Sequence, residues 1–185
     1  MKREEQELLL LLKKALAADL DMESGKNLTK EELDGILTLA DKHSVLALLY
    51  DVLMQMPLQK EQKKLVQNTA ERVAQQNYHL LFLAKYVTGI LKQEQIDAVL
   101  LKGGITASYY PVPELRKSGD VDLFVSDQVR AAELRTLLLK HGIKEQDEQH
   151  ANHHISFDSP DGIIIEIHTD LIEETGKKQL DSYVK

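Results

Sequence analysis

Apolar residues recur at helical spacing through the first ninety-odd positions, which predicts a helical N-terminal region. A first helix should carry one apolar face, made of Leu8, Leu9, Leu12 and Leu16. Thr29 and Glu32 form a candidate capping box at the start of a second helix, because each side chain can satisfy the other residue's free backbone N–H. The Asp-Lys-His-Ser stretch is a candidate break, after which Ser44 would cap a third helix that ends at Pro57.

A long helix is predicted from residue 60 to about residue 93, because one apolar stripe continues through this whole stretch. The stripe consists of Val66, Ala70, Val73, Asn77, Leu80 or Leu81, Ala84, Val87 and Leu91. The helical half contains no repeat of fixed period and no low-complexity tract.

At Ile96 short apolar runs between turn residues replace the helical spacing. Residues 98–101 suit a buried strand that two glycines end, and the stretch after these glycines can begin a helix. Residues 120–125 alternate acidic and apolar side chains, as in a strand with one wet face. Residues 129–142 predict a helix that its final glycine stops.

Two further apolar runs flank a Ser-Pro-Asp-Gly turn, which indicates a β-hairpin. We therefore expect an α+β fold, in which a helical region at residues 1–95 packs on a small mixed-sheet domain at residues 96–185. No Gly/Ser/Pro-rich linker marks the change between them.

Composition narrows the classes of partner and compartment. The chain has 185 residues and a net charge of −7, which disfavours broad binding of duplex nucleic acid but leaves room for a local basic pocket. It has no cysteine, so disulfides and thiolate metal sites are excluded. The N-terminal run of leucines is too short for a membrane span, so we expect a cytoplasmic protein with no membrane partner.

Asp120 and Asp122 stand one residue apart in a segment that otherwise resembles a buried strand. Side chains alternate between the faces of a strand, so both carboxylates should point the same way. Two close carboxylates repel each other, and a divalent cation with oxygen ligands removes that conflict. An isolated Asp-x-Asp is more often a solvent-facing pair at a strand end, so its neighbours decide the interpretation.

Three neighbouring features favour a phosphate and metal site. Gly103 and Gly104 form a turn at a helix start, where a phosphate can approach the backbone. Arg116 could hold a phosphate with two hydrogen bonds, although an arginine taken alone is more often a surface residue. Glu166 and His168 share one face of a later strand, where the carboxylate would complete a site of three acids.

The ordered set of a Leu-Lys-Gly-Gly turn, a Tyr-Pro-x-Pro loop with arginine, Gly-Asp-x-Asp and a later Glu-x-His strand resembles the DNA polymerase beta-type nucleotidyltransferase superfamily. The stretch "LADKHSVLALLYDVL" adds to the likeness, which covers most of the chain and is greatest to a bacterial branch of uncharacterised nucleotidyltransferases. The third acid is Glu166, where the superfamily more often has Asp. Members of this branch continue past the last strand, so we interpret the end at Lys185 as a truncated form or a short variant.

The resemblance implies transfer of a nucleotidyl group from an NTP to an acceptor hydroxyl, with two Mg²⁺ ions and release of pyrophosphate. The residues implied for catalysis and metal binding are Asp120, Asp122 and Glu166. The residues implied for nucleotide binding are Lys102, Gly103, Gly104, Arg116 and His168. The acceptor would be a small molecule or a protein. Two alternatives stay open, an inactive nucleotide-binding or interaction module and a toxin–antitoxin-type enzyme that modifies a partner.

A group of histidines at His150, His153 and His154, with His168 further on, raises the possibility of zinc. The spacing matches no known zinc-finger pattern, and no cysteine is present. We therefore favour the interpretation that one or two of these histidines face the acidic strand.

Overall fold

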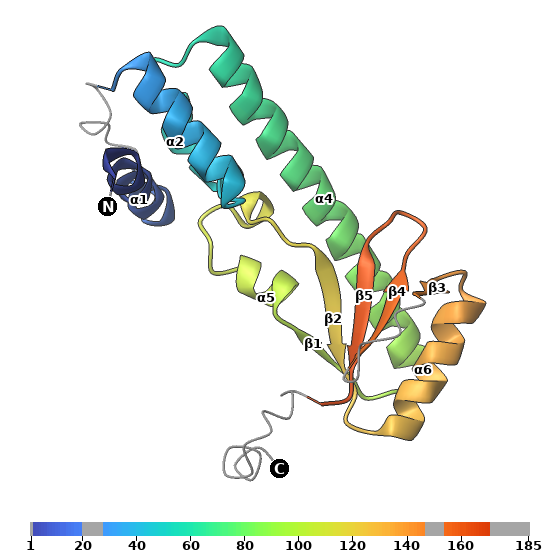
Figure 1. Ribbon diagram of the computed structural model, residues 1–185. Helices are drawn as coiled ribbons and strands as arrows, with labels where there is room; N and C mark the ends of the chain where they lie inside the picture. Colours follow the sequence, from blue (N-terminus) through green and yellow to red (C-terminus); the bar gives the residue numbers. More distant parts are fainter. Residues whose placement is uncertain (1, 20–27, 147–153, 171–185) are drawn as a thin grey trace, which may run out of the picture. The chain divides into compact units, whose positions relative to one another are not determined.

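The computed structural model describes residues 2–19, 28–146 and 154–170 (Figure 1). The backbone divides into two compact units. One consists of Met1–His79 with Thr106–Ser118, and the other of Leu80–Ile105 with Gly119–Lys185. A functional domain that begins at residue 96 stays a prediction.

The first unit is helical. Its elements are α1 (Arg3–Leu16), α2 (Lys30–Lys42), the 3₁₀ turn η1 (Ala47–Leu49), α3 (Tyr50–Met54), the first part of α4 (Lys60–Gln93) and the 3₁₀ turn η2 (Pro113–Leu115). The predicted capping box is confirmed, because Thr29 Oγ1 accepts from the Glu32 N–H and Glu32 Oε2 accepts from the Thr29 N–H. Helix α2 therefore begins where the sequence predicts.

Two expectations for this unit are wrong. In α1 the buried leucines are Leu8 and Leu11, whereas Leu9 and Leu16 are exposed, because the face that packs against α2 and η1 is rotated from the predicted stripe. Ser44 caps no helix, since the next helical turn starts at Ala47. Its backbone has a φ of +58°, and its hydroxyl accepts a hydrogen bond from Lys117 Nζ at 3.2 Å.

Helix α4 has the predicted bounds, and its apolar stripe is buried. The buried members are Val66, Ala70, Val73, Leu80, Ala84, Val87, Ile90 and Leu91. Leu80 fills the position for which the sequence left Leu80 and Leu81 open, and Leu81 is exposed. The helical spacing therefore predicted both the length of α4 and its buried side.

The second unit is built on a five-stranded mixed sheet with the strand order β1-β2-β5-β4-β3. The strands are β1 (Val99–Leu101), β2 (Asp120–Phe124), β3 (Lys144–Glu145), β4 (His154–Asp158) and β5 (Ile164–His168). Strands β2 and β5 pair in parallel, and the other neighbours are antiparallel. The chain is therefore α+β, as the sequence predicts.

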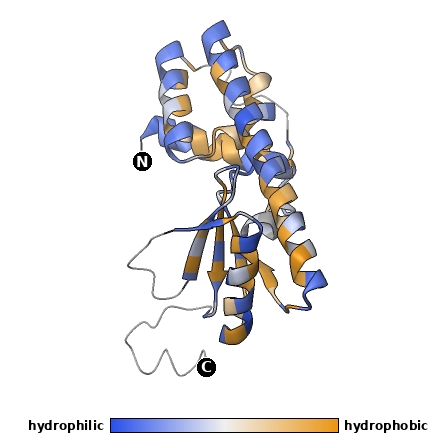
Figure 2. Cartoon of the chain, turned by 90° about the vertical axis from the view of Figure 1, so that its right-hand side faces the viewer, coloured by the Kyte–Doolittle hydropathy of each residue, from blue (hydrophilic) through white to orange (hydrophobic). Residues whose placement is uncertain are grey.

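One face of this sheet is apolar and covered by helices. The C-terminal part of α4 and helix α6 (Gln128–Lys140) pack against it, and Figure 2 shows the apolar stretches on the strands and on this part of α4. The core on this face includes Val121, Leu123, Phe157, Ile165 and Ile167. Since side chains alternate along a strand, the residues between these point to the opposite face.

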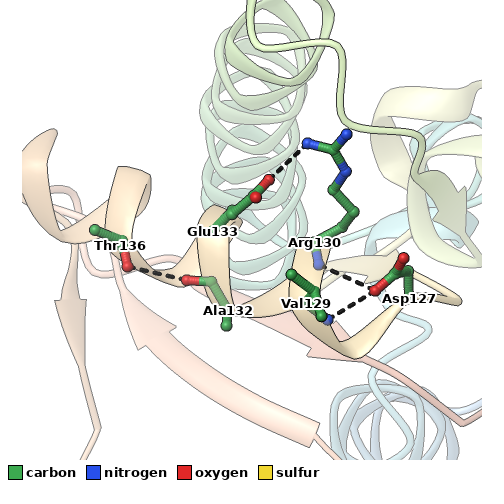
Figure 3. Close-up of polar contacts among 6 residues, drawn as sticks. All are labelled: Asp127, Val129, Arg130, Ala132, Glu133 and Thr136. Carbon is green, nitrogen blue, oxygen red and sulfur yellow. Dashed lines mark hydrogen bonds and ion pairs between the residues drawn. The ribbon is translucent and has the colours of Figure 1, made fainter.

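Helix α6 is fixed at its start by Asp127, whose Oδ1 accepts from the N–H groups of Val129 and Arg130 at 2.7 and 3.3 Å (Figure 3). The side chain of the same Arg130 pairs with Glu133 along the helix, with Nη1 2.7 Å from Oε2. The hydrogen bond and the charge of Glu133 raise the pKa of Arg130 above its ordinary value. Both side chains are exposed, so solvent screens the pair and the Asp127 cap matters more for the helix.

Two details of the sheet differ from the expectation. The strand over residues 98–101 is not buried, because β1 is the edge strand, and its Val99 is 57% exposed. The short strand β3, which pairs with β4, has no counterpart in the predicted elements. Among the helices that the structure describes, none combines the length and the apolar character needed to cross a bilayer.

Candidate functional site

Strand β2 places its two aspartates on the face opposite to the helix-covered core. Val121 and Leu123, which alternate with them, are 1% and 0% exposed and belong to that core. Asp120 and Asp122 therefore share the other face, as the alternation in the sequence predicts.

The third acid joins them through strand pairing. In the parallel register of β2 with β5, Asp122 lies opposite Glu166, and Asp120 lies opposite Ile164. Carboxylate oxygens of Asp120, Asp122 and Glu166 lie within 4.8 Å of one another. Three negative groups at this spacing repel one another unless cations lie near them.

Two basic side chains contact this cluster. His168 Nε2 lies 3.0 Å from Asp122 Oδ1 and 3.3 Å from Glu166 Oε2, and Lys102 Nζ lies 3.6 Å from the same Asp122 oxygen. Asp122 is only 2% exposed, so this position is drier than the wet strand face that the sequence predicts. These contacts stabilise a carboxylate that would otherwise be costly to bury.

The turn before α5 (Gly103–Ala107) lies against the start of β2. Lys102 has a φ of +41°, which is rare for a residue with a side chain and marks a constrained turn. A Cβ on Gly103 would lie 3.4 Å from the Asp120 carbonyl oxygen, so the turn approaches the strand closely. Because Leu101 pairs with Asp122, the Lys102 side chain begins one residue from the acidic cluster.

Arg116 belongs to the first compact unit. There its Nη1 donates to Ser118 Oγ at 2.7 Å, and its guanidinium carbon lies 5.8 Å from the centre of the Tyr110 ring. Asn77 Nδ2 donates to the Arg116 carbonyl at 2.7 Å and so fixes the backbone of this loop. A role for Arg116 in holding a phosphate stays a prediction.

His154 lies next to His168 and Glu166, although it is not among the predicted site residues. It lies opposite His168 in the antiparallel β4–β5 pair, with the ring centres 5.5 Å apart. One ligand atom each of His154, Glu166 and His168 lies within 4.8 Å of the others. His150 and His153, the other histidines of the predicted group, lie outside the described residues.

The position of His154 opposite His168 can be predicted from the hairpin loop in the sequence. Ser159 and Ile163 close a three-residue hairpin loop, in which Gly162 has a φ of +74°. This is the loop type in which a glycine takes the left-handed position. In an antiparallel pair each step back along β4 matches one step forward along β5. From Ser159 and Ile163, five such steps place His154 opposite His168.

The three-acid cluster fits a hard divalent cation. Mg²⁺ takes oxygen ligands, and proteins usually hold it with one or two carboxylates plus the phosphates of a substrate. Asp120, Asp122 and Glu166 supply only oxygens and converge on the sheet face opposite to the one that α4 and α6 cover. The donor chemistry therefore agrees with the metal that the sequence predicts.

Comparison with known proteins identifies one family. The family model described as "Uncharacterised nucleotidyltransferase" matches residues 29–184, which is most of the chain. No curated protein and no solved structure matches the chain.

Proposed function

Because the chain belongs to the uncharacterised nucleotidyltransferase family, we propose that it transfers a nucleotidyl group from an NTP to an acceptor hydroxyl with the help of Mg²⁺. The observation that carries this proposal is the convergence of Asp120, Asp122 and Glu166 on one face of the sheet. The acceptor would be a small molecule or a protein.

In the proposed reaction the acceptor oxygen forms a bond to the α-phosphorus, and the bond from that phosphorus to the bridging oxygen breaks. Pyrophosphate leaves, and the proton of the acceptor hydroxyl passes to a carboxylate oxygen of Glu166, which is 23% exposed on its side chain. Asp120, Asp122 and Glu166 would hold two Mg²⁺ ions, which when bound stabilise charge on the attacking and leaving oxygens.

The remaining residues orient these groups and the nucleotide. The His168 contacts with Asp122 and Glu166, at 3.0 and 3.3 Å, hold the two carboxylates in a fixed arrangement. Lys102 has a side chain that is 69% exposed, so its ammonium group can turn from Asp122 to a bound phosphate. Backbone amides of Gly103 and Gly104 would contact the β- and γ-phosphates.

The test is thermal unfolding of the chain with ATP, GTP, CTP and UTP, each with and without Mg²⁺. A ligand at a hundred times its dissociation constant should stabilise the fold by about 2.7 kcal/mol. We expect one NTP to raise the melting temperature only with Mg²⁺, and we expect Asp122→Asn to lose this shift. Asn has nearly the shape of Asp, so the change tests the charge.

A matched control is Asp161→Asn, which removes an acid from the exposed hairpin loop of the same unit. This variant should keep the full shift. If no NTP stabilises the wild type, or if Asp122→Asn keeps the shift, the proposed function is wrong and an inactive interaction module becomes the better interpretation.

A further inference from the structure

The β4–β5 hairpin carries a second donor cluster that differs in chemistry from the three acids. It consists of His154, Glu166 and His168, which are all half-buried. All three side chains stand on one hairpin, whose register is set by the loop between Ser159 and Ile163 that contains Gly162. The cluster is therefore held by local structure, in contrast to the acidic cluster, which needs strand β2.

Two imidazoles and a carboxylate are a donor set for a borderline transition cation. Zinc is bound by His nitrogen and Asp or Glu oxygen, and sites with three protein ligands leave its fourth position to water or substrate. Mg²⁺ prefers oxygen, so the two histidines favour a different metal from the one that suits the three carboxylates.

The spacing is also compatible with one ion. Bond lengths of about 2.0–2.2 Å at the tetrahedral angle put neighbouring ligand atoms roughly 3.3 Å apart. The ligand atoms of the cluster lie within 4.8 Å of one another, and the two rings are 5.5 Å apart between centres. Small rotations of side chains that are only half-buried would close the remaining distance.

We propose that His154, Glu166 and His168 form a zinc site next to the acidic cluster. Glu166 belongs to both clusters, so Zn²⁺ bound here would withdraw a carboxylate from the three-acid group. The zinc site itself does not depend on the proposed nucleotidyl transfer. Its test needs neither nucleotide nor Mg²⁺, so the two proposals can fail separately.

The experiment is a calorimetric titration of the full chain with Zn²⁺ alone, after removal of metal by a chelator and without a histidine tag. We expect stoichiometric binding by the wild type. The variant His154→Gln should bind Zn²⁺ at least about tenfold more weakly, because even the loss of a group that only supports a ligand costs that much. The control His79→Gln, at an exposed position of α4, should bind like the wild type.

A second measurement does not depend on the folding of a variant. In wild-type protein the side-chain nitrogen resonances of His154 and His168 should shift on addition of Zn²⁺, while those of His79 should stay in place. The inference is overturned if the wild type binds no Zn²⁺, if His154→Gln binds it as tightly as the wild type, or if the resonances of His154 and His168 do not respond.

Discussion

Asp122 on β2 lies directly opposite Glu166 on β5, in the parallel pair of strands at the centre of the candidate site. Parallel neighbours cannot be joined by a tight turn, and here the connection includes α6, β3 and β4. The pair of carboxylates is therefore a product of the sheet topology. His168, two residues after Glu166, contacts both of them.

Removal of the Glu166 charge should weaken divalent metal binding. In Glu166→Gln one of the three carboxylates becomes an amide of similar shape, so the affinity for Mg²⁺ or its probe Mn²⁺ should fall by at least about tenfold. The measurement is the fraction of bound Mn²⁺ from its paramagnetic resonance signal. Asp161→Asn serves as the control, and an unchanged affinity in Glu166→Gln would remove Glu166 from the metal site.

The core on the helix-covered face should dominate the stability of the second unit. Leu134 on α6 is 0% exposed, whereas Leu139 on the same helix is 45% exposed. Leu134→Ala should lower the free energy of unfolding by about 2–5 kcal/mol, because it removes buried methyl groups and leaves a cavity.

The matched change Leu139→Ala should alter the free energy of unfolding by no more than about 0.5 kcal/mol, as for other surface positions. Urea unfolding followed by circular dichroism measures both values. Equal losses in the two variants would contradict the packing of α6 described above.

The capping box of α2 should contribute about 1 kcal/mol to the free energy of unfolding. Thr29→Ala removes the hydroxyl that accepts from the Glu32 N–H, and loss of such a cap typically lowers the free energy of unfolding by that amount. Thr38→Ala is the control within the same helix, since its hydroxyl donates to the Asp34 carbonyl one turn back and caps no helix end. Chemical unfolding of both variants should show a loss for Thr29→Ala and none for Thr38→Ala, which gains helix propensity.

Replacement of each of two glycines by alanine should change the stability of the fold in opposite directions. Gly162 has a φ of +74°, so Gly162→Ala should destabilise the hairpin by about 1–2 kcal/mol. Gly89 lies inside α4, and a Cβ there would meet nothing within 4 Å. Gly89→Ala should therefore stabilise the chain by up to about 1 kcal/mol. Melting temperatures of the two variants test this, and a shift in the same direction for both would be inconsistent with the backbone geometry.

The sequence by itself determined the elements whose signals are local. The capping pair Thr29 and Glu32, the stripe of α4 and the alternation in β2 each depend on short spacings between residues of one element. Periodicity and backbone chemistry are therefore enough to predict them. The same alternation placed Asp120 and Asp122 on one face, and the motif order indicated the family that the comparison identified.

Only the tertiary structure decided which elements meet. The edge position of β1, the register of Asp122 with Glu166 and the contact of Lys102 with Asp122 depend on strands and turns far apart in the chain. The buried face of α1 likewise depends on what packs against it, which is why Leu11 and not Leu9 is inside. Periodicity predicts that a helix has an apolar face, but the elements that pack against this face determine which of its residues are buried.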